Sequence, residues 1–220
     1  MKRSIGKIVG IVLIVSMLLA FAGCGNSKAG DKEQFVGTWK AELDMTDLFN
    51  EGLKQEIAQA DEEMASYFDI EHFGFTVVFK FNEDDTYTTE IDDASLNDSM
   101  DAMKACVRDG MMAYFEDMIA EYELDMSVED MLEASGISIE DIIEEGLSAD
   151  MFDDVLAELE MHGNWKAENG KLYTTETVND KIDKNSYELY EITSEGIKLS
   201  LVDPTEDETG IFPMLLKKVG

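Results

Sequence analysis

The chain has 220 residues, of which 49 are acidic and 17 are basic, and its formal net charge at pH 7 is −32. Such a charge excludes nucleic-acid binding, because every phosphate contact would begin from repulsion, and it disfavours a peripheral grip on anionic lipid, which needs clustered Lys and Arg. Hydrophobic residues make up 45% of the chain, an ordinary share for a folded protein, so the chain is not a disordered acidic tail.

The first 24 residues have the pattern of a secretory signal. Lys2, Arg3 and Lys7 precede an uncharged run over residues 8–22 that is apolar except for Ser16, and Gly23-Cys24 follows it. A basic head, an apolar stretch and small residues at the cleavage point are typical of such signals. The apolar run is short for a membrane-spanning helix, which needs about 20 residues. We therefore expect residues 1–23 to be a cleaved signal peptide, and an uncleaved membrane helix is the alternative.

The segment Phe21-Ala22-Gly23-Cys24 resembles the lipobox of bacterial lipoproteins. This resemblance implies that the Cys24 thiol receives a diacylglyceryl group, that a lipoprotein signal peptidase cuts before it, and that Cys24 becomes the new N-terminus. The mature chain would keep 14 basic and 49 acidic side chains, a net charge of −35. The expected location is the extracytoplasmic face of a cell membrane, with attachment through the lipid. We expect residues 24–34 to be the lipidated Cys and a polar tether.

Residues 35–220 are expected to form one domain that alternates strand-like and helix-like segments. The clearest strand pattern is the strict alternation of Phe73, Phe75, Val77, Phe79 and Phe81. Tight turns are expected at three places, which are residues 82–85, the Asn169-Gly170 pair and residues 193–196. Eight strands are expected near residues 35–43, 73–81, 87–91, 164–168, 171–178, 187–192, 197–201 and 214–219.

Two segments between the strands, residues 45–71 and 97–162, are expected to be helical insertions. Thr46 or Asp47 is a candidate N-cap of the first helix. A long amphipathic helix is expected on the stripe Met100, Met103, Val107, Met111, Tyr114, Met118 and Tyr122. Shorter helices are expected to begin at Ser127, Ser138 and Ser148, the first two with Asp three residues later. Helix-ending glycines are expected at Gly136, Gly146 and Gly163.

The lengths of the connections predict how the strands are arranged. Tight turns join strands 2–3, 4–5 and 6–7, whereas helices or longer loops join strands 1–2, 3–4, 5–6 and 7–8. In an up-and-down meander, this pattern gathers all tight turns at one end and all long connections at the other. We therefore predict an α+β fold, an antiparallel up-and-down eight-stranded β-barrel, closed or open, with helical insertions after strands 1 and 3.

The tripeptide Gly37-Thr38-Trp39 at the start of strand 1 resembles the G-x-W signature of the lipocalin and lipocalin-like (calycin) families. The resemblance implies that Trp39 plugs the barrel floor and that ligands enter at the opposite end, the mouth. That family usually packs an Arg on the Trp. The only Arg of the mature chain lies in the helices, so Lys217 or Lys218 would substitute. The alternative is that Trp39 is an ordinary core residue.

A second Trp, Trp165, lies in a segment whose sequence echoes the one around Trp39. Its position at the start of a strand that follows the helices predicts that it lies by the mouth, beneath the helical insertion. The expected ligand-binding residues are therefore Phe75, Val77, Phe79, Tyr87 and Trp165.

Two hypotheses on function follow from this fold. In the first, the lidded barrel encloses a small apolar or cationic ligand, and the protein is a membrane-anchored binding module. In the second, the protein is a structural or interaction lipoprotein whose barrel is filled by its own side chains and whose acidic helices dock a basic protein partner. Residues 97–162 hold 20 acidic and two basic residues, which suits the second. Whether the barrel interior is solid or hollow distinguishes the two.

Residues that carry chemistry are scarce. His72 and His162 are the only histidines, and no P-loop, H-E-x-x-H, G-x-S-x-G or paired-Cys motif is present. Residues 203–207 lack the glycine and terminal Glu spacing of a calcium loop. Cys106 lies at helical spacing among apolar residues and is expected to be a small buried hydrophobe. We expect a monomer that is not an enzyme and has no metal or cofactor.

Overall fold

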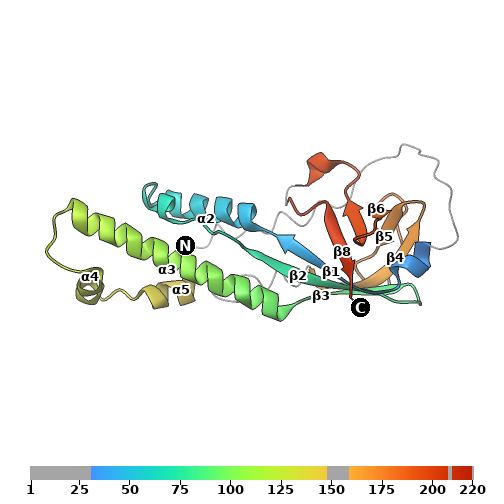
Figure 1. Ribbon diagram of the computed structural model, residues 1–220, viewed down its shortest axis with the longest axis horizontal. Helices are drawn as coiled ribbons and strands as arrows, with labels where there is room; N and C mark the ends of the chain where they lie inside the picture. The colour runs from blue at the N-terminus through green and yellow to red at the C-terminus, as the bar shows by residue number, and fades with distance from the viewer. Residues whose placement is uncertain (1–30, 148–158, 208–209, 220) are drawn as a thin grey trace. The chain divides into compact units, whose positions relative to one another are not determined.

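A computed structural model describes residues 31–147, 159–207 and 210–219 (Figure 1). The predicted signal peptide, Cys24, residues 25–30 of the predicted tether and the helix predicted at Ser148 lie outside the described residues. The chain divides into two compact units, which are described separately. The barrel unit comprises residues 1–43, 75–93 and 152–220, and the helical unit comprises residues 44–74 and 94–151.

The barrel unit is built from eight antiparallel strands that follow one another around a closed barrel in chain order. This confirms the predicted up-and-down arrangement and shows the closed form of the two that the sequence left open, with the last strand pairing with the first through Trp39 and Lys218. The strands are β1 (Gly37–Asp44), β2 (Gly74–Phe81), β3 (Thr86–Ile91), β4 (His162–Glu168), β5 (Lys171–Thr174), β6 (Glu188–Ile192), β7 (Ile197–Ser200) and β8 (Met214–Lys218).

Three tight turns join β2 to β3, β4 to β5 and β6 to β7, as the sequence predicts. Asn169 and Gly170 both have positive φ, 57° and 75°, which is the conformation that Asn-Gly supplies in two-residue hairpins. Thr193 donates its backbone N–H to the Gly196 carbonyl at 2.8 Å and closes the third turn. We call the end of the barrel with these turns the hairpin end, and the opposite end the connection end.

A short helix, α1 (Asp31–Phe35), precedes β1 where the sequence predicts the end of the tether and the start of a strand. The predicted strand start is wrong here because Phe35 buries its side chain as the last residue of this helix. Its side chain is fully buried, and the Trp39 indole Nε1 donates to the Phe35 carbonyl oxygen at 2.6 Å. That hydrogen bond satisfies a carbonyl that the end of the helix would otherwise leave without a partner.

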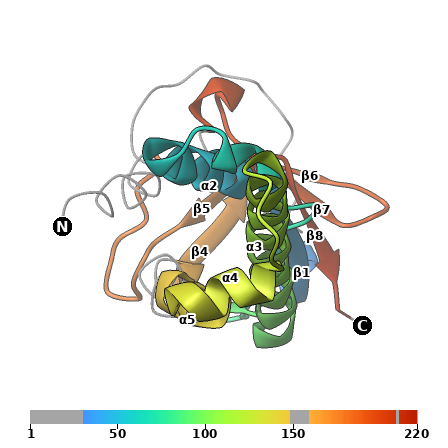
Figure 2. The same ribbon diagram turned by 90° about the vertical axis from the view of Figure 1, so that its left-hand side faces the viewer.

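The helical unit contains four helices and one short 3₁₀ turn among its described residues, and α4 and α5 lie beside α3 (Figure 2). The long helix α3 buries Met100, Met103 and Met111, whereas Tyr122, just past its end, is 66% exposed. The predicted stripe is therefore buried only over its first half. The elements are α2 (Thr46–Ala60), η2 (Met64–Tyr67), α3 (Asp93–Glu121), α4 (Val128–Ser135) and α5 (Ile139–Gly146).

The ends of the short helices follow the predicted punctuation. Ser127 and Asp130 form a capping box at the start of α4, and Ser138 caps α5 by accepting from the Asp141 backbone N–H. Gly136 ends α4 in the left-handed conformation, with φ of 69°, which glycine adopts without strain.

Three predicted helix ends differ from the structure. Met45 is the N-cap of α2, because the Thr46 hydroxyl instead accepts the backbone N–H of Phe73 at 2.9 Å. Gly146 is the last residue of α5, and the cap position falls on Leu147. Gly163 lies within β4, where a Cβ atom would come 1.8 Å from the Thr175 carbonyl oxygen. This glycine is therefore needed for the close approach of two backbones and does not end a helix.

Candidate functional site

The interior of the barrel can be traced from the alternation of buried residues along each strand. On β1, Trp39, Ala41 and Leu43 are buried and their neighbours on the strand face outward. On β6, Glu188 pairs with Leu172 and Tyr190 pairs with Leu199. Both leucines are almost fully buried. Because directly paired residues lie on the same face of a sheet, Glu188 and Tyr190 face the barrel interior.

Aromatic rings close the interior at the hairpin end. The Phe35 ring lies 5.4 Å from Phe81, 5.6 Å from Trp165 and 4.8 Å from Tyr190, measured between ring centroids. These partners belong to β2, β4 and β6, which are not neighbours in the barrel. A single ring can contact all three strands only from inside the barrel. We call Phe35, Phe81, Trp165 and Tyr190 the aromatic floor.

The position of Trp165 corrects the prediction that it lies by the mouth. Its backbone N–H donates to Asp85 at 2.8 Å and its indole Nε1 donates to Asn82 at 3.3 Å. Both acceptors belong to the β2–β3 turn, so Trp165 lies at the hairpin end. The cause is the register, in which Thr86 at the start of β3 already pairs with Asn164. Residues of β4 beyond this pair extend past β3, a stagger that barrels require.

Trp39 lies at the same end, because it bonds to Phe35 of the aromatic floor. Above its ring, at 5.1 Å from the centroid, lies the ammonium group of Lys218. That group also donates to the Val36 carbonyl at 3.4 Å. Of the two candidates Lys217 and Lys218, it is Lys218 that places its cationic group on the face of the Trp39 ring.

The remaining predicted residues lie along β2 and β3. Phe75, Val77 and Tyr87 are buried and Phe79 is half-buried. Phe79 and Tyr87 both stack on Phe81, with centroids 6.3 and 6.0 Å apart. The structure therefore gathers Phe79, Tyr87 and Trp165 around Phe81, a residue that the predicted site left out. Phe75 and Val77 lie further along β2, towards the connection end.

Glu188 is the residue of this interior that sequence reasoning missed. Its Oε2 atom is closed to solvent, and no hydrogen-bond donor of the described residues reaches it. Burial raises the pKa of the Glu188 carboxyl to about 7. An ionised carboxylate is strongly disfavoured in such surroundings unless a partner compensates it. The arrangement therefore provides a half-buried carboxyl group whose Oε2 atom has no partner among the described residues, while a hydrogen bond from the Glu188 backbone opposes the shift in pKa.

Two tyrosines share the interior with Glu188. The Tyr87 hydroxyl donates to the Thr175 carbonyl at 3.1 Å. Burial raises the pKa of Tyr87 to about 12, with the charge of Glu188 as a further cause. Burial also raises the pKa of Tyr190, and the Asp31 carboxylate adds to the shift. Both phenols stay neutral, and aromatic faces around a carboxylate are groups that recognise organic cations.

The sequence around Glu188 explains why it was missed. The residues around Glu188 are apolar or aromatic at both odd and even positions, namely Tyr187, Leu189, Tyr190 and Ile192. The pattern therefore does not indicate which face of the strand points to the barrel interior. In the structure Leu189 and Ile192 are 38% and 41% exposed, and the carboxylate faces inward. Only the cross-strand pairing with β5 decides between the two faces.

Among the described residues, no group of three His, Cys, Asp or Glu side chains is placed to hold a metal ion. The helices of the described segments include none with the length and apolar character to cross a membrane. Comparison of the chain with family models, curated proteins and solved structures found no significant match.

Proposed function

We propose that the protein is a lipid-anchored, extracytoplasmic lipoprotein whose lipocalin-like barrel binds a small organic cation, with Glu188 as its counter-ion. The observation that carries this proposal is the Glu188 Oε2 atom, which is closed to solvent and has no hydrogen-bond partner among the described residues, in an interior lined by aromatic rings. A ligand with an ammonium group and an apolar body would supply the missing charge and contact the rings. Cation–π contacts with desolvated rings contribute about 2 kcal/mol each.

Two features of the barrel support the lipocalin-like assignment. Gly37-Thr38-Trp39 lies at the start of the first strand of a closed eight-stranded up-and-down barrel. The Lys218 ammonium group on the Trp39 ring replaces the Arg usual in that family. The aromatic floor fills the hairpin end, so the ligand would enter from the connection end. A lid formed by the helical insertions stays a prediction.

The membrane anchor rests on residues 1–24. Cys24→Ala should abolish labelling by a fatty-acid analogue and leave an unprocessed precursor in cells. Cys106→Ala is the matched control, because it removes the other cysteine of the chain without touching the lipobox. Unchanged labelling and processing in the Cys24 variant would refute the lipoprotein assignment.

The ligand is tested by calorimetry on the mature chain without its lipid at pH 8, where Glu188 is ionised. The probes are choline, spermidine and octylamine, with octanol as the neutral counterpart of octylamine. We expect at least one amine to bind and Glu188→Gln to weaken that binding at least tenfold. Glu191→Gln, which removes an exposed carboxylate from the same strand, should change it less than twofold.

The other outcomes refute the cation site. Equal binding of octanol and octylamine, unaffected by Glu188→Gln, would indicate an apolar site without a counter-ion. The absence of binding by every probe would favour the alternative hypothesis for the barrel, in which it is filled by its own side chains.

A further inference from the structure

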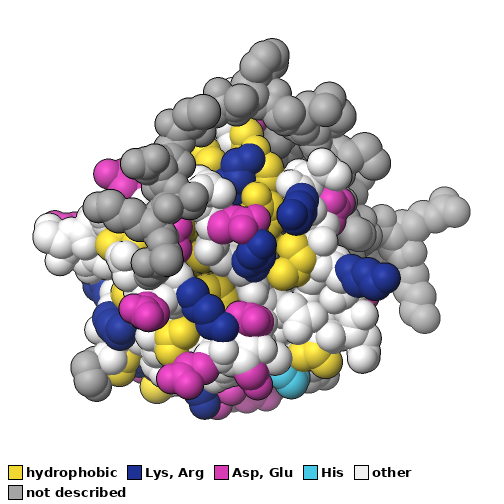
Figure 3. Space-filling model, turned by 90° about the vertical axis from the view of Figure 1, so that its right-hand side faces the viewer, with side chains coloured by type: hydrophobic (Ala, Val, Ile, Leu, Met, Phe, Trp, Pro, Cys, Tyr) yellow, Lys and Arg dark blue, Asp and Glu magenta, His cyan; other side chains and the backbone are white. Residues whose placement is uncertain are grey.

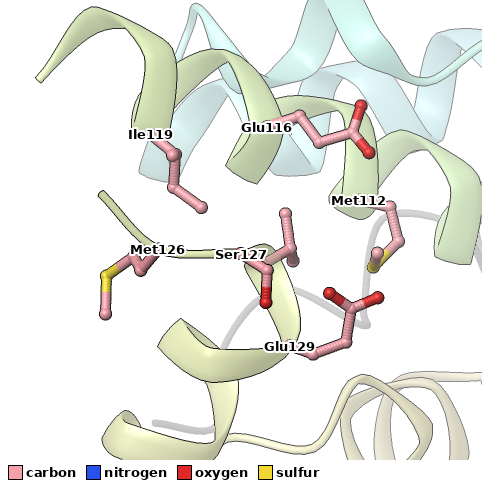
Figure 4. Close-up of a pocket in the computed structure, with 7 residues that line it drawn as sticks. Met112, Glu116, Ile119, Met126, Ser127 and Glu129 are labelled. Atoms are coloured by element: carbon pink, nitrogen blue, oxygen red, sulfur yellow. The ribbon is translucent and has the colours of Figure 1, made fainter. Parts of the chain in front are cut away.

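The helical unit contains a cleft that is independent of the barrel interior (Figure 4). It has a volume of about 240 Å³ and lies between α3 and α4. Ile119 and Met126 lie at one end of it, and Met112 lies at the other with the carboxylates of Glu116 and Glu129. Its lining consists of Met112, Glu116, Ile119, Met126, Ser127, Val128 and Glu129.

Local interactions hold the two walls of this cleft in place. The backbone N–H of Leu124 donates to the Ile119 carbonyl at 3.0 Å and closes the end of α3. The capping box of Ser127 and Asp130 sets the first turn of α4 three residues later. Val128 is buried at the base of this turn. The cleft is therefore a product of regular helix-end geometry.

The size of the cleft limits what can occupy it. Pockets for drug-sized molecules have volumes of roughly 300–1,000 Å³, and this one is smaller. It suits one or two side chains of a larger partner. The neighbouring Tyr122, Leu124 and Met126 are 66%, 44% and 39% exposed. Exposed apolar residues rimmed by charge are typical of protein interaction sites.

Charge decides which kind of partner fits. The helical unit has 25 acidic and three basic residues by sequence. Of the three basic ones, Lys54 pairs with Asp69 and Arg108 pairs with Glu140. No basic side chain of the described residues pairs with Glu116 or Glu129. An acidic partner would meet repulsion at both walls, whereas Lys or Arg on a partner would find two carboxylates flanking an apolar slot.

We propose that this cleft docks a basic amphipathic helix of a partner protein, with an apolar side chain between Met112, Ile119 and Val128. Basic residues one turn away on the same helix pair with Glu116 and Glu129. This is the helix-in-groove mode of recognition, in which anchors recur at i, i+3 and i+4. The site does not depend on Glu188, so the two proposals stand or fall separately.

The test uses the mature chain with its barrel intact and a fluorescent 18-residue peptide of Leu and Lys, with Leu at helical spacing. Glu116→Gln combined with Glu129→Gln should weaken binding at least tenfold by fluorescence anisotropy. Glu144→Gln combined with Glu145→Gln removes the same charge from exposed positions on α5, and should weaken binding less than twofold. Met126→Ser, at an exposed position, should weaken it several-fold.

Three results would overturn the proposal. A scrambled peptide of the same composition that binds equally well would leave only a general electrostatic attraction. Equal effects of the two double variants would also indicate a general electrostatic attraction. Spermidine that binds and is lost in the Glu116/Glu129 variant, while the peptide is unaffected, would assign the cleft to small polyamines.

Discussion

The two units of the chain differ in how their acidic side chains are balanced by basic ones and in where they lie. The barrel unit holds 11 of the 14 basic residues expected in the mature chain, and on the face seen in Figure 3 basic side chains are interspersed with acidic ones. Its interior nevertheless holds one carboxyl group, that of Glu188, whose Oε2 atom has no partner among the described residues. The helical unit has 25 acidic and three basic residues by sequence, and none of its described carboxylates is buried. The total charge therefore says little about where a chemically unusual carboxylate lies.

Carboxylates of the helical unit are stabilised mainly by neutral donors. Asp61 accepts the backbone N–H of Met64 and the hydroxyl of Tyr114, and these bonds lower its pKa. Asp117 accepts the hydroxyl of Tyr67 at 2.7 Å, which raises the pKa of Tyr67 to about 12. Backbone N–H groups and phenols thus replace the scarce cations. The lowered pKa of Asp61 favours its ionised form, whereas burial favours the protonated form of Glu188.

The largest effect on stability is expected when a large side chain of the aromatic floor is removed. Trp165→Ala removes a side chain that is 1% exposed and contacts Phe35 and Phe81. We expect a loss of about 3–5 kcal/mol in the free energy of unfolding, measured in urea. Tyr122→Ala, at a 66% exposed position of the helical unit, should change it by less than about 0.5 kcal/mol. Similar losses in both variants would contradict the contrast between the units.

The second prediction concerns pH and the buried carboxyl. Because the pKa of Glu188 is raised from 4.5 to about 7 on folding, the folded state keeps its proton over a range where the unfolded state has lost it. The free energy of unfolding should therefore fall by about 3 kcal/mol in total as pH rises from 4.5 to 7, and it should stay constant above pH 7. Glu188→Gln should remove this slope and be the more stable protein at pH 8.

Urea unfolding at pH 5 and pH 8 measures the effect, with Glu191→Gln as the exposed control. A slope that persists in Glu188→Gln would show that another group carries it. If a cation occupies the site, it should displace the proton, so its affinity should rise between pH 6 and pH 8.

The sequence was sufficient for features that depend on local chemistry. The Asn169-Gly170 hairpin, the Ser127 capping box and the order of tight and long connections all follow from neighbouring residues, and together they predicted the barrel. The positions of Trp165 and Glu188 depend on register. Trp165 lies one residue past the Thr86–Asn164 pair that ends the pairing of β4 with β3, and Glu188 faces inward only because it pairs with Leu172. One residue of slip reverses the faces of a strand, and no local pattern determined it.

A third prediction compares two glycines of the helical unit. A Cβ at Gly110 in α3 would lie 2.7 Å from the Tyr67 carbonyl oxygen and 2.9 Å from the Phe68 ring, whereas Gly52 in α2 has open space. Gly110→Ala should destabilise the protein by about 1–3 kcal/mol, because the packed helix and turn must separate. Gly52→Ala should stabilise it by about 0.5–1 kcal/mol through helix propensity. Thermal unfolding followed by circular dichroism measures the stability of both variants. A stabilising effect of Gly110→Ala would mean that Tyr67 and Phe68 move away from α3 without a cost in stability.

The smallest expected effect concerns the start of α4, which forms one wall of the cleft. Ser127 accepts the Asp130 backbone N–H at 3.1 Å, and its own N–H donates to the Asp130 carboxylate at 3.3 Å. Ser127→Ala removes the first bond and should cost about 1 kcal/mol. Ser127→Asn keeps an acceptor and should cost only a few tenths. Because α4 has eight residues and cannot persist alone, the loss should appear as faster amide hydrogen exchange over residues 128–135. Unchanged exchange there in Ser127→Ala would mean that packing of Val128 alone holds the helix.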